Sequence, residues 1–235
     1  MEHGTGCLIC GAPLVYGQRS AAVRCFYCGA ASESNAACAN GHFVCDACHS
    51  GSANDLIQRF AAASLSTAPL ADAVALMRNP KIKMHGPEHH FLVPAVLLSA
   101  YYNRTGDPEG RKAEAIATAR KRSDDIKGGF CGFCGNCGAG VGTGIYMSLV
   151  TGSTPVSGAG WRLSNLMTSE SLRAIAERGG PRCCKRDTFT AIQTAVEFTR
   201  RELGVSLDAE GPVVCGFSAL NKECRKMECP FFPRA

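Results

Sequence analysis

The first fifty residues carry eight metal-ligand side chains in four short pairs, a pattern that restricts what this segment can fold into. The pairs are Cys7 with Cys10, Cys25 with Cys28, Cys38 with His42, and Cys45 with Cys48. Zn²⁺ takes four such ligands, so the eight match two tetrahedral zinc sites. So short a segment cannot bury a large core, and bound zinc then supplies most of its stability. We therefore predict a double zinc-binding module over residues 1–52.

The spacing leaves two ways of sharing these ligands, and both satisfy the count. In a sequential arrangement one ion is bound by Cys7, Cys10, Cys25 and Cys28, and the other by Cys38, His42, Cys45 and Cys48. In a crossed-brace arrangement the sets are Cys7, Cys10, Cys38 and His42, and Cys25, Cys28, Cys45 and Cys48. His3 and His49 are spare nitrogens. The downstream CxxC pair that a RING finger requires is missing, so ubiquitin-ligase activity is not expected.

A second concentration of thiols lies at Cys131, Cys134 and Cys137, within a glycine-rich turn. Three thiols at two-residue spacing can converge on one centre, and ferredoxin-type proteins hold an iron–sulfur cluster with such a triple and a distant fourth cysteine. The apolar, helix-like run 140–150 follows, and a helix N-terminus favours thiolates and an anionic cluster. We predict an iron–sulfur cluster here, [4Fe-4S] rather than [2Fe-2S], with zinc as the alternative.

The fourth ligand of this central site is left open by the sequence. The candidates are Cys183, Cys184, Cys215, Cys224 and Cys229. Cys229 precedes a proline, as the distal cluster cysteine often does in ferredoxins. The three C-terminal thiols could instead hold a third metal. Cys183 and Cys184 begin a predicted helix among basic residues, a setting that lowers thiol pKa and also suits nucleophiles or a thiol carrier.

A histidine cluster, Met84-His-Gly-Pro-Glu-His-His, precedes an apolar helix predicted over 91–102. It contains the letters H-x-x-E-H of inverted zinc peptidases. Gly86 and Pro87 intervene, so the two histidines do not share a helical face, and peptidase activity is not expected. His85, Glu88 and His89 are candidates for metal ligation or acid–base catalysis. One hypothesis is that His85 or His89 faces the central cysteines and makes a mixed Cys/His site.

The remainder of the chain reads as mainly α, a helical metal-binding domain over residues 53–235. Helices are predicted over 54–65, 67–78, 107–122, 169–178 and 182–203, in addition to the apolar runs above. Strand signals are few: 12–16 pairing with 22–26 in a zinc-knuckle hairpin, and 212–217 near the C-terminus. The fold class is therefore mainly α, with a small N-terminal zinc-knuckle module of zinc-ribbon or crossed-brace type.

Composition narrows the function classes. The 15 cysteines are an odd number, mostly in short pairs, which suits metal ligation in a reducing cytoplasm better than a disulfide framework. With 46% hydrophobic and 19% charged residues the chain is globular. No leader or membrane-spanning run is expected. The net charge of +5 is mild, so nucleic acid is not an expected partner.

The order of motifs resembles a prokaryotic cysteine-rich family, the domain of unknown function numbered 5714. The resemblance rests on Met-His-Gly-Pro-Glu-His-His at 84–90, Gly-Phe-Cys-Gly-x-Cys-Gly-Ala-Gly at 132–140, Arg-Cys-Cys-Lys-Arg at 182–186 and Cys-Pro-Phe at 229–231. It implies a protein partner of the methyltransferase or radical-SAM type, because related domains are fused to or encoded beside such enzymes. It implies no particular activity.

Three functional hypotheses follow. The first is a cytoplasmic metalloprotein with structural zinc and a central iron–sulfur centre that serves redox, sulfur or one-carbon chemistry beside a partner enzyme. The second is a zinc-only module that docks a protein or RNA. The third is a thiol redox or sulfur carrier that uses Cys183 and Cys184.

Overall fold

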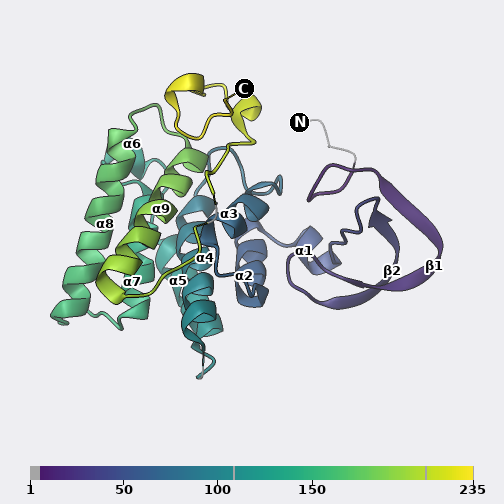
Figure 1. Ribbon diagram of the computed structural model, residues 1–235, viewed down its shortest axis with the longest axis horizontal. Coiled ribbons are helices and arrows are strands. Elements are labelled where there is room, and N and C mark those ends of the chain that lie inside the picture. Colours follow the sequence, from purple (N-terminus) through teal and green to yellow (C-terminus); the bar gives the residue numbers. More distant parts are fainter. Residues whose placement is uncertain (1–5, 108, 210, 235) are drawn as a thin grey trace.

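The computed structural model describes residues 6–107, 109–209 and 211–234. A helical body lies beside a smaller N-terminal module, and the C-terminal segment crosses one end of the body (Figure 1). The protein is mainly helical, as predicted. His3, the spare nitrogen named above, lies outside the described residues, as does position 108 within the helix predicted over 107–122.

The secondary-structure elements are an N-terminal pair of strands followed by helices. In chain order they are β1 (Leu14–Arg24), β2 (Ala31–Cys38), α1 (Asp46–Ser50), α2 (Ala53–Ala63), α3 (Pro69–Met77), α4 (Glu88–Thr105), α5 (Arg111–Asp124), α6 (Phe130–Phe133), α7 (Gly138–Val150), α8 (Ala159–Glu177), α9 (Cys184–Leu203), and two single-turn 3₁₀ helices, η1 (Ser218–Leu220) and η2 (Lys226–Glu228).

The N-terminal module is built on an antiparallel ribbon of β1 and β2. Leu14 pairs with Cys38 at one end and Arg24 with Ala31 at the other, with a register shift between Tyr16 and Ala21. The predicted hairpin of 12–16 with 22–26 is therefore wrong, because both segments lie largely along the single strand β1. The polar residues between them pass through the register shift and do not form a tight turn.

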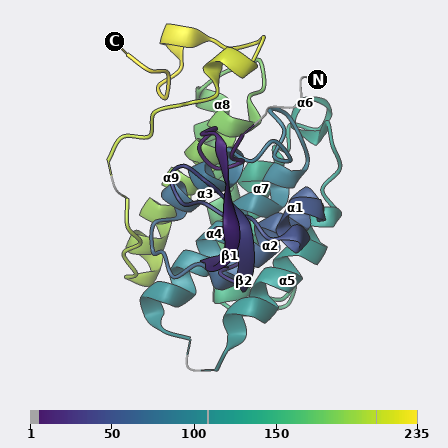
Figure 2. The ribbon, with the colours of Figure 1, turned by 90° about the vertical axis from the view of Figure 1, so that its right-hand side faces the viewer.

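Helix α4 is the centre of the body. Its sequence is apolar on nearly every side, and such a helix is stable only where neighbours surround it. It packs against α2, α3, α5, α7 and α9. The Ser99 hydroxyl, buried among these helices, donates to the Ala61 carbonyl at 2.8 Å, so its burial leaves no unpaired donor. Figure 2 shows the surrounding helices from the side of the N-terminal ribbon.

Two helix ends follow local capping rules. Ser52 and Asp55 form a capping box at the start of α2, and α9 ends at Gly204, whose φ of 67° is a left-handed cap. Helix α8 begins ten residues earlier than the predicted 169, at Ala159. The predicted strand 212–217 is wrong: in the described part of the chain this segment pairs with no strand.

The N-terminal module is fixed to the body through Tyr27. This side chain is only 1% exposed, stacks edge to face on Phe60 of α2, and accepts a hydrogen bond of 3.1 Å from Asn79 Nδ2 after α3. The predicted division of the chain at residue 52 stays a prediction. Within the described residues, no helix combines the length and the apolar character that crossing a membrane requires.

Candidate metal centres

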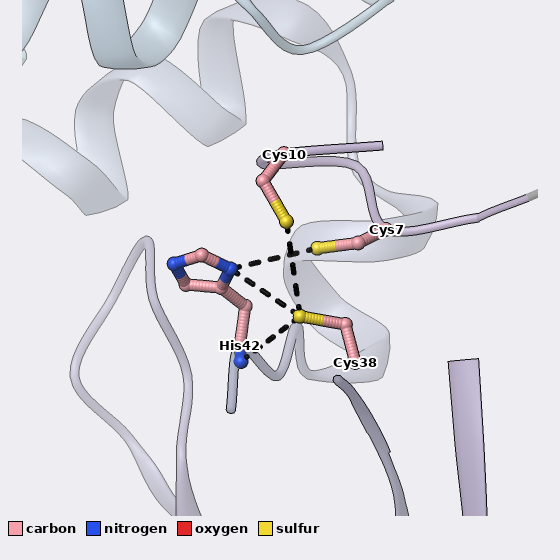
Figure 3. Close-up of side chains that lie close together, drawn as sticks. All are labelled: Cys7, Cys10, Cys38 and His42. Atoms are coloured by element: carbon pink, nitrogen blue, oxygen red, sulfur yellow. Dashed lines mark hydrogen bonds between the residues drawn. The ribbon is translucent and has the colours of Figure 1, made fainter. Parts of the chain in front are cut away.

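The first candidate centre joins Cys7, Cys10, Cys38 and His42, whose ligand atoms all lie within 4.8 Å of one another (Figure 3). Nδ1 of His42 is 3.4 Å from Sγ of Cys38 and 3.8 Å from Sγ of Cys7. Four ligands about 2.3 Å from a tetrahedral Zn²⁺ lie about 3.8 Å apart, so these separations fit one zinc ion. The amide of Ala12 lowers the pKa of the Cys10 thiol to about 6, which favours the ligating thiolate.

The second candidate centre joins Cys25, Cys28, Cys45 and Cys48, again with all sulfur atoms within 4.8 Å. Of the two arrangements that the sequence allows, the structure therefore has the crossed one: the ligands of each site are separated in the chain by ligands of the other. These eight residues are the predicted zinc ligands, and the two clusters could bind metal as predicted.

Two matching turns present the first pair of ligands at each centre. Gly11 donates to the carbonyl of Cys7 at 2.8 Å, and Gly29 donates to the carbonyl of Cys25 at 2.9 Å. Both glycines have left-handed φ values, 73° and 66°, which other residues adopt only with strain. The amide of Ile9 points at Sγ of Cys7 at 3.4 Å, and such N–H···S bonds favour the thiolate form.

A different kind of site lies in the helical body, in a cavity of about 240 Å³. Helices α4, α7 and α9 all begin at its wall, where Pro87 and Cys137 are the N-caps of α4 and α7, and Cys184 is the first residue of α9. The positive ends of three helix dipoles therefore meet at one place. We call it the central cavity.

Three thiols line the central cavity: Cys131 of α6, Cys137 and Cys184. Burial, with the nearby Asp187 carboxylate, raises the pKa of Cys137 to about 11 and that of Cys184 to about 12. At neutral pH both are protonated, so a cation must displace the protons before they act as ligands. Cys134, the middle residue of the predicted triple, is exposed and is not among the residues that line this cavity.

His85 also lines the central cavity, and its two ring nitrogens differ. Nε2 lies 3.2 Å from Oδ1 of Asn221, which also accepts from the amide of Glu223, so Nε2 carries the proton. Nδ1 then has a lone pair, and it is buried with no hydrogen-bond partner. A metal-binding histidine commonly donates its other N–H to an oxygen acceptor in this way.

The other members of the histidine cluster are engaged in the fold. Nε2 of His89 donates to the Lys83 carbonyl at 3.1 Å, and its Nδ1 accepts from the Thr188 hydroxyl at 2.9 Å. Glu88 accepts from the Lys83 amide at 2.6 Å. Neither ring nitrogen of His89 is left for a metal. Nδ1 of His90 donates to the Ile126 carbonyl at 3.1 Å.

The remaining candidate ligands lie elsewhere. Cys183 lines a separate small cavity together with the C-terminal cysteines Cys215, Cys224 and Cys229. The adjacent Cys183 and Cys184 therefore serve different cavities, which sequence reasoning did not foresee. It also missed Asp187, although Asp187 follows Cys184 by three residues and so shares its helical face. Asn221 carried no sequence signal.

The fold and the sites define a mainly helical, cysteine-rich protein with two N-terminal clusters that could bind metal. The sequence model of a family of unknown function (DUF5714) matches residues 57–232, well over half of the chain, so the chain belongs to this family. The resemblance seen in the sequence is confirmed. No curated protein and no solved structure matches the chain.

Proposed function

We propose that this protein is a cytoplasmic metalloprotein with structural zinc in its N-terminal module and an iron–sulfur cluster in the central cavity, held by Cys131, Cys137, Cys184 and Nδ1 of His85. The observation that carries the proposal is the buried, unpartnered Nδ1 at a cavity with three thiols. A buried polar atom without a partner costs about 1–3 kcal/mol, and a ligated metal removes that cost.

The size of the central cavity favours a cluster over a single ion. Its volume of about 240 Å³ is large enough for a group of several atoms. Converging helix N-termini favour the negative charge of a thiolate-bound cluster.

Backbone amides also point at the thiols, as hydrogen bonds to cluster ligands do. The amides of Ala139 and Gly140 lower the pKa of Cys137, and that of Gly86 lowers the pKa of Cys184, against the larger effect of burial. Hydrogen bonds to ligand sulfur are one of the means by which proteins tune cluster potentials. The same surroundings thus support a redox role.

The position of the central cavity allows a partner enzyme to approach it. A neighbouring cavity of about 520 Å³ shares Cys131, Cys137, Arg182 and Asp187 with it. Phe133, which is 93% exposed, lies at this outer cavity. We propose that a partner of the methyltransferase or radical-SAM type approaches here, and that the centre exchanges electrons, sulfur or one-carbon groups with it.

The first test is the metal and sulfide content of anaerobically purified protein, together with its visible spectrum. The expected result is zinc together with iron and a matching amount of acid-labile sulfide. Zinc without iron or sulfide in protein reconstituted anaerobically would reject the cluster.

A pair of variants then tests the assigned ligands. Cys137→Ser should lose iron, sulfide and colour while it keeps its zinc, because Cys137 lines the central cavity. Cys134→Ser is the matched control, an exposed cysteine three residues away, and should keep all of them. Full iron content in Cys137→Ser would show that the centre is elsewhere.

A zinc-only docking module is the second candidate, and one observation favours it. Leu14, Val15 and Tyr16 are consecutive, largely apolar and exposed on β1. A colourless protein with zinc alone would support this function. The thiol-carrier hypothesis has less support, because Cys183 and Cys184 line different cavities and burial raises both of their pKa values.

A further inference from the structure

One cysteine at the start of α9 and three from the C-terminal segment line one small cavity between these two parts of the chain. The four cysteines are Cys183, Cys215, Cys224 and Cys229. The cavity has a volume of about 20 Å³, against about 240 Å³ for the central cavity. A volume of this order holds about one water-sized sphere, so it has room for a single ion and not for a cluster.

The turns at two of these cysteines repeat the geometry of the N-terminal centre. The amide of Phe217 points at Sγ of Cys215 at 3.4 Å, and the amide of Lys226 at Sγ of Cys224, also at 3.4 Å. In each the donor is two residues after the cysteine, as Ile9 is after Cys7 in the first candidate zinc centre, again at 3.4 Å. Such bonds stabilise the thiolate that Zn²⁺ binds.

Positive charge lies close to these sulfur atoms. The Lys185 ammonium, buried above the Phe217 ring, interacts favourably with Cys183 and Cys215. Arg186 and Arg225 also line the cavity. Four thiolates around one Zn²⁺ carry a net charge of −2, and Lys185 offsets part of it, whereas Arg186 pairs with Asp187 and Arg225 pairs with Glu228.

The C-terminal segment, like the N-terminal module, has little regular structure of its own to hold it in place. Between Leu203 and Arg234 the described residues contain only the single turns η1 and η2. Its contacts with α9 include the edge-to-face pair of Phe231 with Phe189 at 5.2 Å. A segment with little regular structure and a small core is where a structural metal adds most stability.

We infer that Cys183, Cys215, Cys224 and Cys229 form a third zinc site, which fastens the C-terminal segment to the start of α9. No three of their sulfur atoms lie within 4.8 Å of one another, so zinc binding requires these side chains to move closer together. The inference does not depend on a cluster in the central cavity. It assigns the neighbours Cys183 and Cys184 to two different centres.

Zinc content of the full chain is the test. The wild-type protein, made metal-free and reloaded with zinc alone under reducing conditions, should bind one zinc more after competition with a chelator than Cys224→Ser and Cys215→Ser bind. Cys134→Ser, an exposed cysteine outside both cavities, is the control and should match the wild type. Equal zinc content in the wild type and both variants would overturn the inference.

A second measurement on the unaltered chain guards against variants that fail to fold. ¹¹³Cd NMR of cadmium-loaded protein should show two tetrathiolate signals, one from the Cys25 quartet and one from the C-terminal site. A single tetrathiolate signal overturns the inference. Loss of iron and sulfide from Cys224→Ser, with zinc unchanged, would likewise overturn it and would place a cluster there. Loss of iron from Cys137→Ser alone concerns only the central cavity, so the two proposals are tested separately.

Discussion

His89 is 1% exposed at the start of α4, with a hydrogen-bond partner at each ring nitrogen. Burial, together with the positive charge of Lys185, lowers its pKa to about 3. In the unfolded chain the imidazole takes up a proton near pH 6.5. Below that pH the unfolded state therefore binds more protons than the folded state, and stability falls as the solution becomes more acidic.

Replacing His89 with Asn removes this pH dependence. The variant should be less stable than the wild type at pH 7, because it loses hydrogen bonds of a buried group. The difference in unfolding free energy between the two proteins should shrink by up to about 1.4 kcal/mol for each pH unit between about 6.5 and 5. Only the wild type loses stability there, because only its unfolded state has a His89 that takes up a proton. Denaturant unfolding at several pH values measures it. The exposed His49→Asn is the control, and parallel curves for wild type and His89→Asn would contradict the argument.

The histidine cluster could be found from the sequence, but the sequence could not show which of its histidines keeps a ring nitrogen free for a metal. His85 and His89 have the same side chain and lie four residues apart. They differ because Thr188 and Asn221, about 100 residues away or more, occupy one ring nitrogen of each, and only His89 has a second partner. The members of the two N-terminal clusters that could bind metal were predicted residue by residue, because their spacing within the chain is itself the signal.

Helix α7 depends on glycines at two faces. Gly138 and Gly142, four residues apart, face α4: a Cβ at Gly142 would lie 2.9 Å from the His90 carbonyl oxygen and from Cδ of Pro94. Gly140 and Gly144, also four apart, face α8. The helical repeat thus allows α7 to approach both α4 and α8 closely. This close packing places Cys137, at the start of α7, at the central cavity.

Gly142→Ala should therefore destabilise the protein by about 1–3 kcal/mol, the usual range for overpacking, although alanine is the better helix former. The contacts are a backbone carbonyl and a proline ring, which cannot rotate away. Thermal or denaturant unfolding measures the change. Gly158→Ala is the control, since a Cβ there meets no atom within 4 Å and should change stability by less than about 0.5 kcal/mol. An equally stable Gly142→Ala variant would show that α7 can shift outward.

Elements with strong local signals were predictable and those decided by packing were not. The helix predicted over 182–203 ends at Leu203, as predicted, because Gly204 caps it. Residues 159–168 have weak helical periodicity and a glycine near the start. They are helical because Met167 and the residues around it pack on α7. The β1 and β2 ribbon was mispredicted because its polar, exposed sequence carries little alternation.

Across the whole molecule, the crossed sharing of ligands makes a distinct prediction for paired substitutions. Cys10→Ser with His42→Ala damages one site, so the chain should lose one zinc. Cys10→Ser with Cys28→Ser damages both, so it should lose two. Zinc content after equilibration with a competing chelator measures the difference, and the Cys134→Ser variant is the control. The reverse pattern, two lost and then one, would support the sequential arrangement.

The crossed arrangement also determines when each site can form while the chain is being synthesised. In a sequential arrangement the first site could close as soon as Cys28 leaves the ribosome. In the observed order neither site has its four ligands until His42 has emerged, and the second follows only six residues later at Cys48. Until then several unligated cysteines remain in an unfolded segment, where they can be oxidised or can bind other metals. For clusters of this kind, metal supply and a reducing environment during synthesis limit how much correctly loaded protein forms.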